Sequence, residues 1–179
     1  MSKSLKNVVN PDDVIAEYGA DTFRLYEMYM GPLEASKPWN TRDIIGVFRF
    51  LQRAWRLAVD ERTGEILAAA QPDAKIEKLL HRTIHKVGED IERMAFNTAI
   101  SAMMVFVNEA QKDPAKLGKS QAERYVQTLA PFAPHLAEEL WQRLGHGKTL
   151  AYEPWPAYDE ALTKDASIEL AVQVNGKVK

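Results

Sequence analysis

Four arginines gather on one face of a predicted helix in the first third of the chain. Arg49, Arg53 and Arg56 are four and then three residues apart, and Arg42 lies two turns earlier on the same face. No acidic residue occurs between positions 44 and 59. Guanidinium groups grip phosphate oxygens with paired hydrogen bonds, so this arginine ridge predicts contact with a nucleic-acid backbone. An alternative that stays open is a solvated face whose acids come from a neighbouring helix.

A second predicted helix carries His81 and His85 on one face. Two imidazoles four residues apart can bind zinc, with Glu77 or Glu89 as a third ligand. No glutamate follows His81 in the metalloprotease pattern, so solvated or RNA-facing histidines are favoured and no metal site is predicted. A weaker basic row on the same helix is diluted by acids and is expected to be a solvated face. It comprises Lys75, Lys78, Arg82 and Lys86.

The composition excludes several classes of protein. The 179 residues include no cysteine, which excludes disulfide scaffolds, cysteine nucleophiles and thiolate zinc sites. No serine stands in a Gly-x-Ser-x-Gly elbow and no glycine-rich phosphate loop exists, so the chain carries no self-contained active site. No apolar run approaches the roughly 20 residues that span a bilayer, and the first four residues lack the apolar core of a signal peptide. A cytoplasmic protein without membrane contact is expected, and the net charge of −2 argues against one that mainly coats nucleic acid.

Periodic apolar residues predict four long helices, so the expected fold is mainly α, a helical bundle. These helices are expected over residues 41–60, 73–94, 97–111 and 121–144. Pro131 and Pro134 predict a break in the last of them, because proline removes a helical hydrogen bond. Two shorter helices should precede them, the first beginning after Asn10 and ending at Gly19, the second ending at Gly31.

The first long helix should bury an apolar stripe opposite the arginine ridge. The expected stripe comprises Ile44, Phe48, Leu51, Trp55 and Ala58. Leu140 is expected in the core as well. Alternating apolar residues over 168–174, followed by Asn175 and Gly176, predict a β-strand and a hairpin turn. The chain stops three residues later. The hairpin would therefore be incomplete, and the sequence is expected to be truncated at this end.

The opening Ser-Lys-Ser gains its meaning from the residues that follow it. Ser2, Lys3 and Ser4 precede Asn7-Val8-Val9-Asn10-Pro11, and then Tyr18-Gly19-Ala20-Asp21 with Arg24. This order resembles the end of the catalytic domain of class I aminoacyl-tRNA synthetases. There a Lys-Met-Ser-Lys-Ser loop precedes Gly-Asn-x-x-x-Pro and then Tyr-Gly-Ala-Asp-x-x-Arg. The first lysine of that loop would stand just before residue 1, so the chain is expected to be truncated at its start too.

Further blocks extend the resemblance over essentially the whole chain. They are Tyr29-Met30-Gly31-Pro32-Leu33, Arg49-Phe50-Leu51, Phe96 to Ser101, Leu129 to His135, Glu138 to Trp141, Trp155-Pro156 and Val172 to Lys177. In their order and spacing these blocks resemble the bacterial-type leucyl-tRNA synthetases. The resemblance implies three parts: residues 1–40 as the end of the catalytic domain, 41–164 as the α-helical anticodon-binding domain, and 165–179 as the start of a truncated C-terminal domain.

The same resemblance implies an activity for the full enzyme, which joins leucine to tRNA-Leu with ATP and Mg²⁺. Lys3 would be catalytic and would stabilise the departing pyrophosphate, while Ser2 and Ser4 would bind ATP with it by holding the loop closed. Arg42, Arg49, Arg53 and Arg56 would bind the tRNA backbone. The fragment alone should bind no cofactor and should be inactive, and a monomer is expected.

Other interpretations stay open. The chain is alternatively a helical RNA-binding domain, a protein-interaction bundle whose arginine ridge meets an acidic partner, or the corresponding region of an isoleucyl-, valyl- or methionyl-tRNA synthetase. Steep salt dependence of binding would distinguish an RNA partner, because each neutralised phosphate releases counterions.

Overall fold

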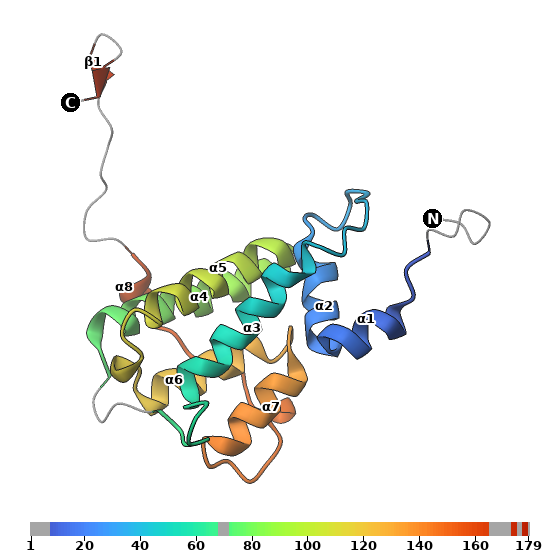
Figure 1. Cartoon of the computed structure of the whole chain (residues 1–179). Helices are drawn as coiled ribbons and strands as arrows, with labels where there is room; N and C mark the ends of the chain where they lie inside the picture. The colour runs from blue at the N-terminus through green and yellow to red at the C-terminus, as the bar shows by residue number, and fades with distance from the viewer. Residues whose placement is uncertain (1–7, 68–71, 165–172, 175–176, 179) are drawn as a thin grey trace.

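Helices make up most of the molecule (Figure 1). The computed structural model describes residues 8–67, 72–164, 173–174 and 177–178. The helices are α1 (Pro11–Tyr18), α2 (Ala20–Tyr29), α3 (Ile44–Ala58), α4 (Ala74–Glu92), α5 (Phe96–Ala110), α6 (Lys119–Leu129), α7 (Pro134–Arg143) and α8 (Glu160–Thr163), with short 3-10 turns at Pro114–Lys116 and Leu150–Tyr152. The predicted fold, mainly α and a helical bundle, is confirmed.

A short strand pair follows α8 in the chain. Strand β1 (Gln173–Val174) pairs antiparallel with β2 (Lys177–Val178). The predicted turn at 175–176 and most of the predicted strand before it lie outside the described residues.

The corner between α1 and α2 is made at Gly19. The Asn10 side chain caps α1 by accepting the N–H of Asp12 at 3.2 Å. Gly19 then adopts φ +87° and ψ 155°, a conformation open almost only to glycine, and donates its N–H to the Ile15 carbonyl at 2.8 Å. Helix α2 therefore starts at once in a new direction, with Asp21 in its first turn.

One helix boundary differs from the prediction and another agrees with it. Helix α3 ends at Ala58 rather than near residue 60, because Val59 turns to extended backbone and forms a β-bridge with Ile66. The break predicted from the two prolines is confirmed. Helix α6 ends at Leu129, and Pro134 occupies the first position of α7, where its missing N–H costs nothing.

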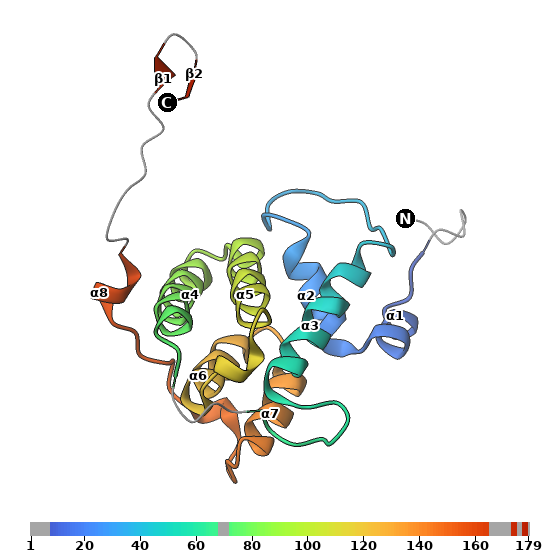
Figure 2. The same ribbon diagram turned by 60° about the vertical axis from the view of Figure 1, so that its left-hand side comes forward.

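The helices pack around one shared core (Figure 2). Helices α4 and α5 lie side by side, and α5 also contacts α2 and α3. Helix α6 packs on α4 and α7, and α7 in turn reaches α2 and α3. Phe50, Phe106 and Phe132 are the largest side chains that are completely buried. Helix α2 thus joins α1 to the rest of the bundle, and Tyr18 at the end of α1 adds a contact with Phe48 of α3.

The predicted stripe of α3 is partly wrong. Ile44, Leu51 and Ala58 are buried, but Phe48 and Trp55 are only partly buried. The buried face instead adds Val47, Phe50, Ala54 and Leu57, since α3 is covered by α5 as well as by α2 and α7. The ring of Phe48 meets Tyr18 edge to face, and that of Trp55 lies 5.0 Å from the Arg143 guanidinium. Leu140 is buried as expected.

No helix in the described ranges is both long and apolar enough to cross a membrane.

Candidate nucleic-acid interface

The arginine ridge lies on the outer face of α3. Arg42 precedes the helix in a turn, and Arg49, Arg53 and Arg56 follow along it. Arg42, Arg49 and Arg56 are exposed, and Arg53 is half-buried. Arg49 and Arg56 therefore point away from the core, as the sequence predicts, whereas Arg42 lies before the helix and the Nε atom of Arg53 is buried without a hydrogen-bond partner among the described residues.

Only one member of the ridge has an acidic partner within the described part of the chain. Arg56 Nε lies 2.8 Å from Glu61 Oε1, and both side chains are about half exposed, so the pair contributes little to stability. The side chains of Arg42, Arg49 and Arg53 form no ion pair with the described residues. Glu61 lies in the turn that follows α3, so none of the four arginines is paired with an acid from a neighbouring helix among the described residues.

The basic row on α4 has its own acids. Lys75 pairs with Glu109 of α5 at 2.5 Å, and Lys86 pairs with Asp90 at 2.7 Å. Hydrogen bonds from Lys112 and Lys75 lower the pKa of Glu109 to about 2. Acidic partners at Lys75 and Lys86 are what a solvated face looks like, in contrast to the arginine ridge.

His81 makes contacts through both ring nitrogens. Its Nδ1 accepts the backbone N–H of Asp159 at 2.8 Å, and its Nε2 lies 2.9 Å from Glu77 Oε1 and 3.3 Å from Arg124 Nη1. Neither nitrogen remains for a metal. His85 instead faces the ring of Tyr158 at 4.9 Å. The described residues contain no group of three metal-ligating side chains.

Glu77 also joins α4 to α6. Its carboxylate accepts two hydrogen bonds from Arg124 Nη2, at 2.7 and 2.8 Å, and one from Gln121 Nε2 at 2.9 Å. Burial by itself would raise the pKa of Glu77, but the hydrogen bonds from Arg124, Gln121 and His81 outweigh it and lower the pKa. Sequence reasoning missed this network, because its members stand more than 40 positions apart.

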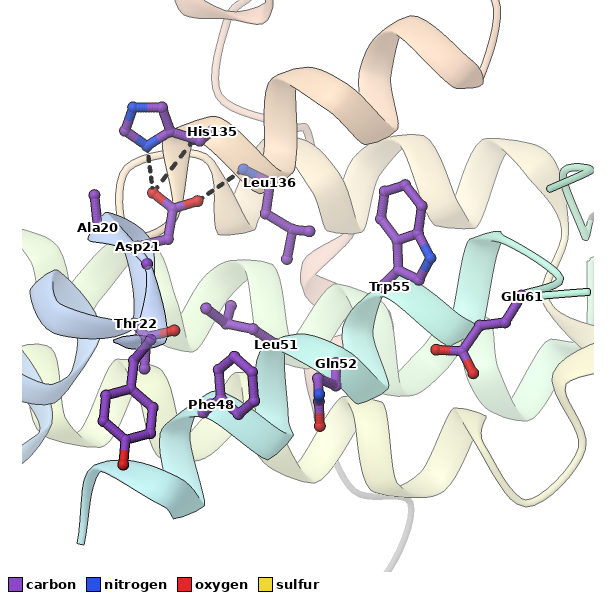
Figure 3. Close-up of a pocket in the computed structure, with 12 residues that line it drawn as sticks. Ala20, Asp21, Thr22, Phe48, Leu51, Gln52, Trp55, Glu61, His135 and Leu136 are labelled. Atoms are coloured by element: carbon purple, nitrogen blue, oxygen red, sulfur yellow. Dashed lines mark hydrogen bonds and ion pairs between the residues drawn. The ribbon is translucent and has the colours of Figure 1, made fainter. Parts of the chain in front are cut away.

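A second unpredicted junction joins α2 to the start of α7 (Figure 3). One oxygen of Asp21 accepts the Leu136 N–H at 2.7 Å, and the other lies 2.8 Å from His135 Nδ1 and 3.4 Å from the His135 backbone nitrogen. Arg24 donates from Nη2 to the Pro131 carbonyl at 3.2 Å. We call these two side chains the α2 clamp. A usable signal was present, since α7 begins at Ala133-Pro134 without a capping side chain of its own.

An apolar groove of about 510 Å³ lies beside the clamp. It runs between the α1–α2 corner, α3 and α7, and Figure 3 shows Phe48, Leu51, Trp55 and Leu136 along it. Its polar margin includes Asp21 and His135, which already bond each other.

The predicted catalytic and ATP-binding residues Ser2, Lys3 and Ser4 lie outside the described residues. The described chain begins at Val8 and enters α1 after the Asn10 cap.

Two family models match the chain. Residues 73–179 match the anticodon-binding domain of tRNA ligase, and residues 1–37 match the class I tRNA synthetases for isoleucine, leucine, methionine and valine. The ranges agree with the order of parts that the sequence predicts, although the proposed division at residues 40 and 164 stays a prediction.

Curated relatives are similar over the whole chain. The leucine–tRNA ligase of Leptospira biflexa serovar Patoc is 54% identical over 180 residues, that of Treponema pallidum subsp. pallidum 51% over 201, and leucine–tRNA ligase 1 of Rhizobium johnstonii 50% over 181. The chain spans only 21–22% of the length of these relatives.

A solved structure shares the fold. The LeuRS of Agrobacterium radiobacter, crystallised as a ternary complex with tRNA and LeuAMS, matches with a TM-score of 0.79 and 33% identity. The match covers all of this chain and 25% of that one. The predicted resemblance to leucyl-tRNA synthetases is thereby confirmed, and the chain belongs to the family of the anticodon-binding domain of tRNA ligases.

Proposed function

We propose that this chain is one part of a leucine–tRNA ligase, an enzyme that attaches leucine to tRNA-Leu at the expense of ATP. The observation that carries the proposal is the identity of 50–54% to such ligases along the entire chain. The whole enzyme would work in the cytoplasm as a monomer. The chain by itself would lack most of the catalytic domain and would not activate leucine.

The proposed division of labour follows the order of the chain. Residues 1–40 end the catalytic domain, 41–164 form the tRNA-binding bundle, and 165–179 begin a C-terminal domain. Lys3 would place its positive charge against the departing pyrophosphate of ATP, and Ser2 and Ser4 would hold its loop closed. Mg²⁺ would enter with ATP as part of the substrate.

The arginine ridge is the proposed tRNA contact. Three of its four guanidinium groups have no acidic partner among the described residues, and they follow one line from the turn before α3 along this helix, exposed at Arg42 and Arg49 and half-buried at Arg53. Such a line suits the phosphate backbone, which positions an RNA without reading its sequence. The crystallised relative of this chain was solved with tRNA, which supports an RNA partner.

The proposal is tested in the full-length enzyme by two assays run side by side. Leucine-dependent ATP–pyrophosphate exchange measures activation, and a tRNA-Leu titration at several salt concentrations measures binding. The double variant R49E/R53E should leave exchange unchanged, weaken tRNA binding, and reduce the salt slope by about one unit per lost phosphate contact. Lys148→Glu, an exposed cation beyond α7, is the matched control.

Each of the two assays can contradict a different part of the proposal. Absence of leucine-dependent exchange in the unsubstituted full-length enzyme would refute the ligase assignment. An unchanged titration in the double arginine variant would refute the RNA contact alone and favour a protein partner for the ridge.

A further inference from the structure

Helix α3 carries the arginine ridge and one wall of the apolar groove on neighbouring faces. Gln52 marks the border, because it is three residues from Arg49 and four from Arg56 along the helix. It is also four residues from Phe48 and three from Trp55, whose rings line the groove (Figure 3). The two faces therefore form one continuous surface, which is charged on one side of Gln52 and aromatic on the other.

Both aromatic rings of α3 are held in position by a contact with another helix. Phe48 meets Tyr18 of α1 edge to face, with the ring centroids 5.8 Å apart. Trp55 lies 5.0 Å from the guanidinium of Arg143, which donates to Glu139 within α7. Both rings nevertheless stay only partly buried. A ring that is fixed before binding loses little conformational freedom when a flat molecule stacks on it.

The groove also offers hydrogen-bonding groups that the chain leaves unused. The side-chain amide of Gln52 is half-buried and has no hydrogen-bond partner among the described residues. An amide presents a donor and an acceptor together, which complements the edge of a nucleobase. The two carboxylates at the margin already have donors, since Asp21 bonds to α7 and Glu61 to Arg56. Their repulsion of an RNA is therefore limited.

We propose that the groove binds one unpaired base of the tRNA, stacked against Phe48 and Trp55 and contacted at its edge by Gln52, while the ridge contacts the adjacent phosphates. This inference rests on the proposed function. Unpaired bases of RNA are recognised by stacking on aromatic side chains and by hydrogen bonds to their edges. An apolar protein segment in the same groove would leave the Gln52 amide without a partner, which is costly. The ridge alone positions the RNA, and the groove adds selectivity for a nucleotide outside the paired stems.

The test titrates the full-length enzyme with a tRNA-Leu transcript at several salt concentrations. Phe48→Leu and Trp55→Leu keep an apolar side chain but lose a stacking ring, so each should weaken binding about 5- to 100-fold. The salt slope should stay unchanged, because no phosphate contact is lost. Trp55→Phe keeps a ring and should bind within about threefold of the unsubstituted enzyme. Gln52→Ala leaves the core untouched and should weaken binding about 3- to 10-fold.

Chemical probing of the bound tRNA provides a second measurement. Dimethyl sulfate and a carbodiimide together modify the edges of all four unpaired bases. The saturating unsubstituted enzyme should protect at least one unpaired base, and saturating Trp55→Leu should not protect it. The matched control is Tyr158→Leu, another partly exposed aromatic residue, which should keep both the affinity and the protection. Tyr158 packs on His85 of α4, and α4 and α5 separate it from α3 (Figure 2).

Three outcomes would contradict different claims. If Phe48→Leu and Trp55→Leu bind tRNA as Tyr158→Leu does while R49E/R53E binds weakly, the groove holds no base and a protein segment is its occupant. If the ring variants lose affinity together with salt slope, the rings only support the ridge and the inference is equally wrong. If the unsubstituted enzyme shows no leucine-dependent exchange, the proposed function itself has failed.

Discussion

The carboxylate of Asp21 caps the helix to which Leu136 belongs, although 115 positions separate the two residues. Within α7 the N–H groups of His135 and Leu136 are those that a local cap would satisfy. Ala133, at the local cap position, has no side-chain acceptor. The cap is therefore supplied by another helix, and the start of α7 becomes a contact between α2 and the bundle.

Loss of this cap should lower the stability of the 179-residue chain by a measurable amount. Asp21→Ala removes the acceptor for the partly buried N–H groups at the start of α7 and should lower the free energy of unfolding by about 1–2 kcal/mol. Urea denaturation followed by circular dichroism measures the change. Glu27→Ala, at an exposed position of the same helix, is the control and should change stability by less than about 0.5 kcal/mol. Equal effects of the two variants would contradict the capping role.

The Glu77 network should make stability depend on pH. The pKa of Glu77 is lowered in the folded chain. The stabilisation that its carboxylate provides is therefore complete at neutral pH, and it is lost as the pH falls below about 4.3, the unfolded value, toward the pKa of the folded state. Glu77→Gln leaves Arg124 without its charged partner and should cost about 1–3 kcal/mol at pH 7 and less in acid. Urea unfolding at both pH values, with exposed Glu92→Gln as control, measures this difference. A cost that does not shrink in acid would contradict it.

Replacing Phe50 by alanine should destabilise the chain more than replacing the larger Trp55. Phe50 is completely buried, and Phe50→Ala should cost about 3–5 kcal/mol of unfolding free energy. Trp55 borders the open groove and is only partly buried, so Trp55→Ala should cost about 1–2 kcal/mol. Urea midpoints of the two variants rank them. The reverse order would mean that the face of α3 turned to the core has been misassigned.

Replacing Tyr125 by phenylalanine should not lower the stability of the chain. Its ring stacks on Phe106 at 4.6 Å, but its buried hydroxyl has no hydrogen-bond partner among the described residues. Burial also raises the pKa of the phenol, so it should stay protonated in alkali until the chain unfolds. Tyr125→Phe should leave stability unchanged or raise it by up to about 1 kcal/mol. Thermal unfolding measures the effect, and a clear loss would reveal a hidden partner of the hydroxyl.

Single substitutions should separate members of the arginine ridge. Arg49 has no acidic partner among the described residues, whereas Glu61 already neutralises Arg56. Arg49→Ala should therefore weaken tRNA-Leu binding more than Arg56→Ala, by about a threefold to tenfold margin at low salt. A filter-binding titration with the full-length enzyme gives both affinities. Equal losses would show that Glu61 releases Arg56 when RNA binds.

The features of the fold that the sequence determined are those that depend on a few neighbouring residues. The α1 cap at Asn10, the corner at Gly19 and the break before Pro134 each depend on one residue's own backbone preference, and the structure confirms all three. The existence and order of the long helices follow from apolar periodicity, which is also local. Arg49 and Arg56 are exposed as expected, because their spacing is set within a single helix, whereas Arg53 between them is half-buried.

The tertiary structure determined the features that depend on contacts between helices far apart in the sequence. Periodicity places Phe48 and Trp55 on an apolar stripe, but only the packing of α5, α2 and α7 around α3 determines that Phe50 is covered and Trp55 left at a groove. The partners of His81 and Asp21 come from segments 78 and 114 or more positions away. A single sequence shows which side chains can bond. The fold alone brings a given donor within 3 Å of its acceptor, because that distance depends on how whole helices cross.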